Sequence, residues 1–288
     1  MDQAQQLRNI VKQEGKKRPK ARVITVTSGK GGVGKTSISV NLAIQFAHLG
    51  KRVVILDADF GLANIEVLLG IHPRYNLYDM MYEGKKLHEI VTVGPENVGF
   101  ISGGSGIREM VHLSEEQLFG LAVSLTDLDH VADVIIIDTG AGIDDTIMKF
   151  TAESDDALIV VTPEPTSITD SYALLKTLDK QLGKEKGPKV QLLANRVSSV
   201  GEGKELYEKV NAVVKKFLGI QLDYLGHLPQ DENVSRAIIQ QNPFSISYPD
   251  TAARRAIYSI AATLNGMEPE QEKKKGLAVI FQNLFHKI

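Results

Sequence analysis

The feature that most constrains this chain is a glycine-rich loop with two lysines. It consists of Gly29, Lys30, Gly31, Gly32, Val33, Gly34, Lys35, Thr36 and Ser37 and fits the phosphate-binding pattern G-x-x-x-x-G-K-[ST]. An apolar, β-branched run at 23–27 precedes it, and apolar residues at helical spacing follow it. Loop N–H groups and a helix N-terminus together attract phosphate. We therefore expect the segment to bind a nucleoside triphosphate, with Lys35 at the β- and γ-phosphates and Thr36 at Mg²⁺.

The rest of the chain predicts alternating strands and helices. Apolar runs predict strands at 23–27, 52–56, 98–101, 133–137, 156–161, 189–194 and 222–227. Helical patterns fall between most of them, for example at 114–128, 166–182 and 203–217. Strands that are apolar throughout are typical of a parallel sheet covered on both faces. We expect an α/β fold, a doubly wound, mostly parallel sheet of the P-loop NTPase type, in one domain over residues 21–266.

A second site element is the apolar run at 134–137, which ends in Asp138. In register with a phosphate-binding loop, such a carboxylate predicts a Mg²⁺ ligand acting with Thr36.

The chain has no cysteine, which excludes disulfides, thiolate catalysis and cysteine-ligated clusters. Its net charge of −2 argues against a protein whose main role is to coat DNA. With no apolar signal core or membrane-length run in the sequence, we expect a cytoplasmic protein.

The second lysine narrows the class. The stretch from Lys30 to Thr36 resembles the deviant Walker A loop of the MinD/ParA branch of P-loop ATPases. This resemblance implies that Lys30 crosses a dimer interface to phosphates bound by the other subunit. ATP would then be the substrate and would also bridge two subunits. Without ATP, we expect the protein to be a monomer. A solvated loop lysine is the plainer alternative.

The resemblance extends to the segments after three strands. By this resemblance, residues 57–64 correspond to switch I. It implies that Asp59 orients or polarises the attacking water and that Asp57 lies near the Mg²⁺ shell. The simpler alternative is an acidic turn that caps a helix at 62–69. Residues 139–142 look like switch II, although many relatives carry proline where this chain has Gly140. Asn195, Arg196 and Pro229 resemble the residues that lie beside the adenine in similar ATPases. The sequence lacks the Asn-Lys-x-Asp signature of guanine recognition, which favours ATP over GTP.

The C-terminal segment predicts a membrane-binding helix. Apolar residues form one stripe of a helix over 276–288: Leu277, Ile280, Phe281, Leu284, Phe285 and Ile288. A polar linker at 267–275 precedes it and ends in three lysines. A core helix would show the same stripe, but this combination fits an interfacial helix that meets anionic lipid. Two tails on an ATP-bridged dimer would bind more tightly than one through avidity, so we expect reversible binding to the inner face of the cell membrane.

The N-terminal segment separates close relatives. Residues 1–20 comprise a short motif and a basic linker, and the motif includes Asp2, Gln3, Ala4, Leu7 and Arg8. This motif is similar to that of the FlhG (YlxH) family of flagellar-number regulators. The resemblance to this family covers essentially the whole chain. That similarity implies stimulation of the FlhF-type signal-recognition GTPase, with flagellar C-ring components or transcription factors as further candidate partners. A disordered tail with a solubilising linker is the alternative for this segment alone.

Three other functions stay open at this point. A cell-division site regulator of the MinD type is the nearest, and the N-terminal extension argues against it. A ParA-type DNA-partitioning ATPase would bind DNA in place of lipid. A non-enzymatic adaptor would keep the nucleotide as a structural element, and the set of Lys35, Thr36, Asp59 and Asp138 argues against that.

Overall fold

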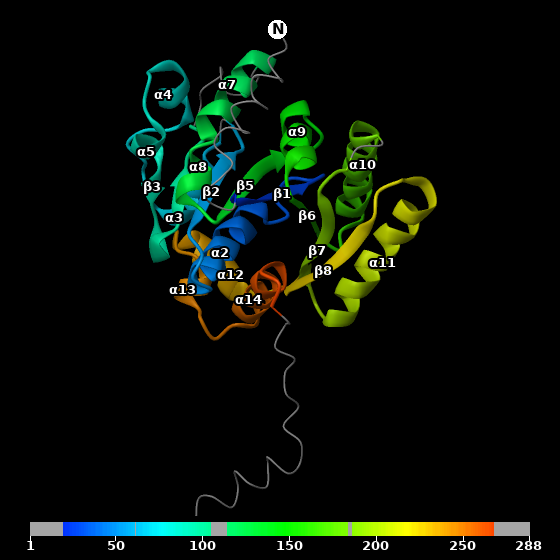
Figure 1. The fold of residues 1–288 in the computed structure, drawn as a ribbon. Helices are drawn as coiled ribbons and strands as arrows, with labels where there is room; N and C mark the ends of the chain where they lie inside the picture. Colours follow the sequence, from blue (N-terminus) through cyan, green and yellow to red (C-terminus); the bar gives the residue numbers. More distant parts are fainter. Residues whose placement is uncertain (1–19, 61, 105–113, 184–185, 268–288) are drawn as a thin grey trace, which may run out of the picture.

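The computed structural model describes residues 20–60, 62–104, 114–183 and 186–267 (Figure 1). The strands are β1 (Arg22–Ser28), β2 (Val53–Ala58), β3 (Thr92–Val93), β4 (Gly99–Ile101), β5 (Val134–Ala141), β6 (Asp156–Val161), β7 (Lys189–Val197) and β8 (Leu222–Pro229). The longer helices are α2 (Lys35–His48), α7 (Glu115–Leu125), α9 (Asp145–Glu153), α10 (Pro165–Leu182), α11 (Val200–Phe217), α12 (Glu232–Ile239) and α14 (Ala252–Leu264). Short helices are α3 (Asn64–Leu69), α4 (Leu77–Tyr82), α5 (Leu87–Ile90), η1 (Pro95–Asn97), α8 (Leu128–Val131) and α13 (Phe244–Ser247).

The eight strands form one sheet in the order β3-β4-β2-β5-β1-β6-β7-β8. All neighbouring strands are parallel except β3 and β4, which pair antiparallel. The predicted α/β fold with a doubly wound, mostly parallel sheet is confirmed, and each of the seven predicted strands is present. The eighth, β3, was not predicted because two residues are too few to show an alternating pattern.

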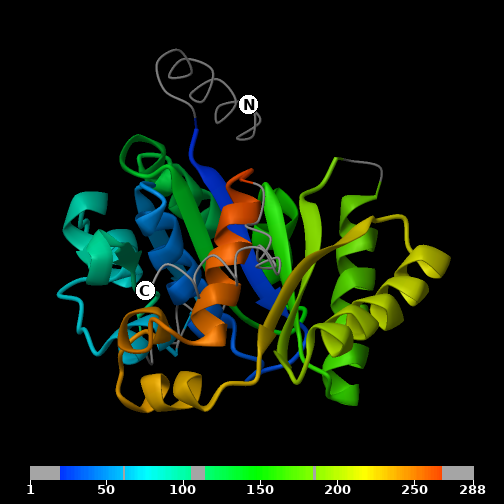
Figure 2. The same ribbon diagram turned by 90° about the horizontal axis from the view of Figure 1, so that it is seen from below.

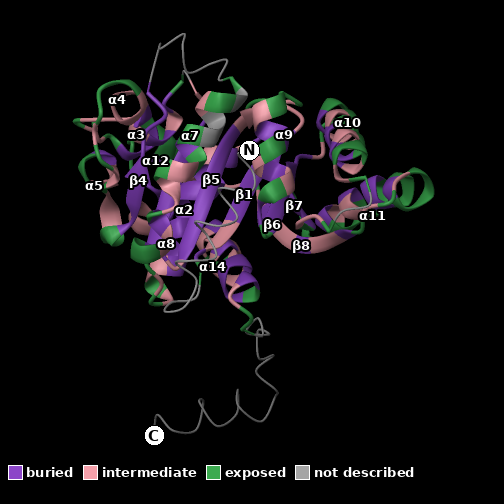
Figure 3. Cartoon of the chain, turned by 45° about the horizontal axis from the view of Figure 1, so that its top comes forward, coloured by how far each residue is buried: buried purple, intermediate pink, exposed green. Residues whose placement is uncertain are grey.

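Both faces of the sheet are buried, because successive strand residues point to opposite sides. Ile55 and Ile136 belong to the core cluster that also contains residues of α2 and α14. Leu56 and Ile137 on the other face pack in a cluster with residues of α7 and α8. Figure 3 shows the buried strands between helices whose outer surfaces are exposed. Within the described residues, no helix is both long and apolar enough to cross a membrane.

The phosphate-binding loop connects β1 to α2 at the carboxyl edge of the sheet. Gly34 has φ of 98°, a left-handed conformation that favours glycine, and α2 begins at the next residue. Neighbouring strands bring two carboxylates to the same edge, since Asp57 on β2 is the register partner of Asp138 on β5. In open parallel sheets this edge is where ligands bind.

The opposite edge of the sheet joins the first strand to the last helix. Arg22 donates from Nε to Asp156 at 2.6 Å and from Nη1 to the carbonyl oxygen of Leu264, at the end of α14. Figure 2 shows this end of α14 beside the start of β1. The described chain thus enters at Lys20 and leaves at Met267 close to one another, away from the phosphate-binding loop.

Two predicted helices differ in their bounds. The pattern at 114–128 predicts one helix, whereas the structure has α7 and α8 separated at Thr126 and Asp127. The helix predicted at 203–217 begins three residues earlier, at Val200, because Ser199 caps it through the N–H of Glu202. Neither difference moves the predicted site.

Candidate nucleotide-binding site

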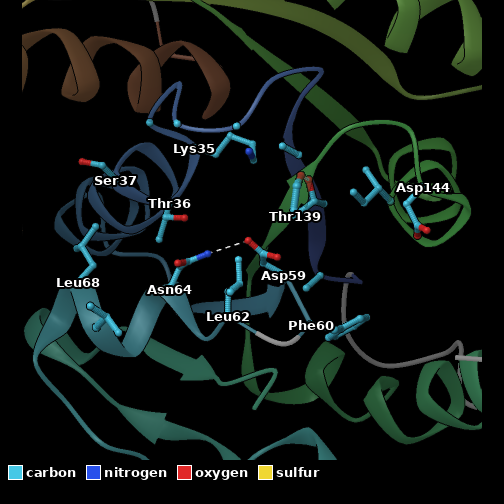
Figure 4. A pocket seen from close by; sticks show the side chains of 18 of the residues that line it. Lys35, Thr36, Ser37, Asp59, Phe60, Leu62, Asn64, Leu68, Thr139 and Asp144 are labelled. Carbon is cyan, nitrogen blue, oxygen red and sulfur yellow. Dashed lines mark hydrogen bonds between the residues drawn. The ribbon is translucent and has the colours of Figure 1, made fainter. Parts of the chain in front are cut away.

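A cavity of about 760 Å³ lies at the carboxyl edge of the sheet between the phosphate-binding loop and the ends of β2 and β5. Its lining includes Lys35, Thr36, Asp59, Asn64 and Gly140. Figure 4 shows these elements converging on the hollow, with the side chains of Lys35, Thr36 and Asp59 among those that line it. The sequence segments predicted to form one site are therefore brought together.

Lys35 is buried and held within its own loop. Its Nζ donates to Ser28 Oγ at 3.1 Å, and that hydroxyl donates to the carbonyl oxygen of Lys30 at 2.7 Å. Burial lowers the pKa of Lys35, while the carboxylates of Asp138 and Asp59 act in the opposite direction. The ammonium group is thus desolvated, and no carboxylate of the described residues lies at hydrogen-bond distance from it, which suits a cation that receives phosphate.

Asp138 is fully buried, and its two carboxylate oxygens differ in their hydrogen bonding. Its Oδ1 accepts from Ser39 Oγ at 2.8 Å, whereas Oδ2 has no hydrogen-bond partner among the described residues. Burial raises the pKa of Asp138 to about 6, although hydrogen bonds from Thr36 and Ser39 lower it. An orphaned buried oxygen beside a loop threonine fits the requirements of a Mg²⁺ site.

The described residues contain no group of three His, Cys, Asp or Glu side chains that could hold a metal. Mg²⁺ does not need such a group, because it is usually bound through one or two protein ligands together with substrate phosphates and water. Thr36 and Asp138 are therefore a sufficient protein contribution.

Asp57 is buried, and both of its carboxylate oxygens accept hydrogen bonds from backbone N–H groups that follow β2. Its Oδ1 accepts from the N–H of Asp59 at 3.1 Å, and its Oδ2 accepts from the N–H of Ile65 at 3.2 Å. Burial, followed by the charge of Asp138, raises the pKa of Asp57 well above its usual value. Asp57 thus ties the backbone at Asp59 and at Ile65 to the end of β2, and its side chain, like that of Asp138, is absent from the cavity lining.

Asp59 lies in the cavity and contacts two other elements. Its Oδ2 accepts from Asn64 Nδ2 at 2.7 Å, the bond drawn in Figure 4. Its Oδ1 faces Gly140 of β5, where a Cβ atom would be only 3.2 Å away. Burial raises the pKa of Asp59, while Lys35 and Asn64 lower it.

Lys30 points away from this cavity, toward the start of α10. Its Nζ contacts the carboxylate of Glu164 and donates to Thr166 Oγ1 at 2.8 Å. Both partners belong to the same chain, and the lysine and glutamate side chains are 33% and 52% exposed. Lys30 is therefore tethered at the surface.

Asn195, Arg196 and Pro229 come together in a small cleft next to Gly34 and Ser37. Asn195 Nδ2 donates to the carbonyl oxygen of Val33 at 2.7 Å, and its Oδ1 accepts from the N–H of Arg196. Arg196 has φ of 57°, a left-handed conformation that is uncommon for a side-chain-bearing residue. The end of β7 is thereby attached to the phosphate-binding loop.

Sequence reasoning assigned no role to Ser28, Ser39, Asn64 or Glu164. Each acts through a side-chain contact to a predicted site residue, and only the position of Asn64 within the switch I segment signalled it. The residues predicted to activate a partner, Asp2, Gln3, Ala4, Leu7 and Arg8, and those predicted to bind a membrane, from Leu277 to Ile288, lie outside the described residues.

This geometry, a phosphate-binding loop with a buried lysine and an adjacent strand-end aspartate, defines a P-loop NTPase. The ParA family model, described as NUBPL iron-transfer P-loop NTPase, matches residues 20–265. The chain belongs to the ParA family of P-loop NTPases, and it is an ATPase whose ligands are ATP and Mg²⁺.

Relatives and solved structures agree with this assignment. The chain is 42% identical to the antiactivator FleN of Pseudomonas aeruginosa over 87% of this chain and 88% of that protein. It is 33% identical to the flagellum site-determining protein YlxH of Helicobacter pylori, over 84% and 81%. The fold matches the cell division ATPase MinD of Pyrococcus furiosus with a TM-score of 0.71 at 22% identity, covering 85% of this chain and 99% of that chain.

Proposed function

We propose that the protein is an ATP-dependent, dimerising, membrane-associating ATPase that regulates the number or placement of flagella. The observation that carries this proposal is the similarity to FleN and YlxH, which extends over more than four fifths of the chain in both cases. The name of the second relative refers to the site of a flagellum. The predicted features of both terminal segments support the same role.

In the proposed mechanism, the loop from Gly29 to Ser37 wraps the phosphates, and Lys35 exchanges its bond with Ser28 for phosphate oxygens. Thr36 and Asp138 would hold Mg²⁺, which when bound neutralises charge on the β- and γ-phosphates. Asp59 accepts a hydrogen bond from the attacking water and orients it. Little covalent chemistry is needed from the protein, because positioning and charge stabilisation dominate phosphoryl transfer.

Two placements refine the predicted roles. Both oxygens of Asp57 are used by backbone N–H groups, so we assign Asp57 to holding switch I near the Mg²⁺ shell. Asn195, Arg196 and Pro229 line the cleft beside the loop, and we assign them to the adenine of the bound nucleotide. Lys30 would bridge to the second subunit after leaving Glu164.

The terminal segments extend the proposal to a membrane and a partner protein. The tail at 276–288 would anchor the ATP-bound dimer to anionic lipid on the inner face of the cell membrane. Each of its three preceding lysines contributes about 1 kcal/mol on such lipid, so a single tail binds weakly and a pair binds well. The motif around Asp2 and Leu7 would stimulate an FlhF-type GTPase.

Co-sedimentation with anionic liposomes tests the membrane step. We expect the full chain to sediment more with ATP than with ADP, and a chain ending at Lys275 to stay in the supernatant with either. Binding that is equal in both nucleotides, or that persists without the tail, would contradict the proposed switch. Neutral liposomes are the control for the charge contribution.

A division-site regulator of the MinD type is the second candidate, since the chain is 31% identical to the septum site-determining protein MinD of Helicobacter pylori over 92% of its length. The N-terminal segment separates the two functions. Stimulation of an FlhF-type GTPase by the full chain, and its loss on removing residues 1–20, would favour the flagellar role. No stimulation would favour the division role.

A further inference from the structure

The side chain of Asn41 on α2 joins the phosphate-binding segment to a helix that is 204 residues away in the sequence. Its Nδ2 donates to the carbonyl oxygen of Ser37 at 2.7 Å, and its Oδ1 accepts from the backbone N–H of Ser245 at 2.8 Å. Asn41 is 1% exposed, so both bonds lie in the interior of the protein. One amide group thus connects α2 to α13, which lie next to one another in Figure 1.

This amide caps α13 from outside the helix. Ser245 is in the first turn of α13, where backbone N–H groups have no acceptor within the helix. Pro243, at the N-cap position, makes no side-chain hydrogen bond to the helix. A partner for this buried N–H group therefore has to come from another element, and Asn41 supplies it.

The segment from the end of β8 to the start of α13 bounds the small cleft beside the phosphate-binding loop. Its residues in the cleft lining include Gln230, Asp231, Val234, Ser235, Ile238 and Phe244. On the side of the loop, α2 contributes Ser37 and Ile38. The width of the cleft thus depends on how this segment is held relative to α2.

The helix in the middle of that segment, α12, packs weakly, so its position depends on its two ends. All eight of its residues are described, and among them Ala237 alone is buried. Before α12, the N–H of Gln230 donates to a carbonyl oxygen at the end of β7 at 2.9 Å. After α12, the buried Phe244 and the bond between Ser245 and Asn41 fix α13. Of these attachments, the bond to Asn41 leads directly to the phosphate-binding segment.

We propose that Asn41 is a positioning residue for the base of the nucleotide: it sets the distance between the phosphate-binding segment and the wall of the base cleft. The proposal rests on the assignment of that cleft to the adenine under the proposed function. Without the amide, the N–H of Ser245 would be buried without a partner, and α13 would shift to find one. The loop N–H groups and Lys35 stay in place. Binding of the whole nucleotide therefore weakens, whereas binding of its phosphates alone is affected little.

The test compares the affinity for ATP with the affinity for inorganic triphosphate, which has neither base nor ribose. We expect Asn41→Ala to weaken ATP binding about fivefold to tenfold, the effect of one buried hydrogen bond, and triphosphate binding by less than about twofold. Titration calorimetry on the full chain with Mg²⁺ measures both constants. Equal losses for the two ligands, or no loss for ATP, would overturn the proposal. If Asn41→Ala does not fold, Asn41→Ser takes its place with the same expected result.

Two further variants separate the bond to Ser245 from the general effect of a buried change. Asn41→Asp keeps an acceptor for the N–H of Ser245, so it should retain the native ratio of the two affinities although it loses the bond to Ser37. Asn211→Ala removes a buried amide that donates to Tyr207 and lines neither cavity, so it should change neither affinity. A ratio as low as that of Asn41→Ala in either variant would contradict the proposal.

The native protein tests the underlying assignment of the cleft. If the cleft holds the adenine, the unchanged chain binds ATP more tightly than triphosphate. Equal affinities in the native protein would refute that assignment and the proposal with it. A native preference for ATP that Asn41→Ala retains would refute only the role of Asn41.

Discussion

The ammonium group of Lys30 is paired with the carboxylate of Glu164 in the same chain. An amine that is to reach phosphates in a second subunit must first leave this partner and Thr166. The pair therefore opposes the proposed ATP-dependent dimer by the free energy of one partly exposed ion pair.

Glu164→Gln should strengthen dimerisation in the presence of a non-hydrolysable ATP analogue. A pair of this exposure is weak because solvent screens it, so the dimer dissociation constant should fall only about two- to fivefold. Sedimentation velocity measures it, and Glu208→Gln on the exposed face of α11 is the charge-matched control. Unchanged or weaker dimerisation would show that the pair does not restrain Lys30.

Asp138→Asn should stabilise the nucleotide-free protein while it abolishes Mg²⁺-dependent hydrolysis. Burial of the charge raises the pKa of Asp138 to about 6, and the amide removes that charge but still accepts from Ser39. At pH 8 we expect a melting temperature higher by several degrees, corresponding to on the order of 1–3 kcal/mol.

The same variant has a defined pH dependence. A raised pKa in the folded state means that the native protein gains stability as pH falls through about 6 toward 3.8, the ordinary pKa of an aspartate. The difference between Asp138→Asn and the native protein should therefore shrink from pH 8 to pH 5. A difference that stays constant over this range would mean that Asp138 is not the titrating group.

Ser39→Ala should raise the Mg²⁺ concentration needed for half-maximal hydrolysis by about tenfold or more. The hydroxyl of Ser39 holds Oδ1 of Asp138 at 2.8 Å and so orients the free Oδ2; removal of such an orienting bond weakens metal affinity by about 10-fold or more. Ser154→Ala, which also removes a buried hydroxyl, is the control. The prediction fails if a Mg²⁺ titration gives the same midpoint for both variants.

Asn195→Asp should weaken nucleotide binding although it changes only one atom. The carboxylate cannot donate to the carbonyl oxygen of Val33, which Asn195 Nδ2 contacts at 2.7 Å, so two acceptors would face each other beside the loop. We expect the dissociation constant for ATP to rise about tenfold, or ~1.4 kcal/mol. Calorimetry should find no such change for the exposed Asn242→Asp.

Much of the fold and of the cavity could be predicted because both depend on local patterns. Apolar strands such as residues 134–137 and the loop before Thr36 are contiguous in the sequence, and a parallel sheet places strand ends at one edge. The contacts that modify the site are of another kind. Glu164 is 134 residues from Lys30, and Gly140 on β5 meets Asp59 just after the neighbouring strand β2, so neither contact has a local signature.

β1 runs from the edge of the sheet that holds the phosphate-binding loop to the opposite edge, where α14 ends. Seven residues span about 20 Å, and the strand is paired on both sides, with β5 and β6, which holds its two ends at a fixed separation. One end carries Ser28, the partner that Lys35 must release to take up phosphate. The other end carries Arg22, which holds the last turn of α14. A single strand therefore joins the residue that Lys35 must leave to the point at which the described chain begins and ends.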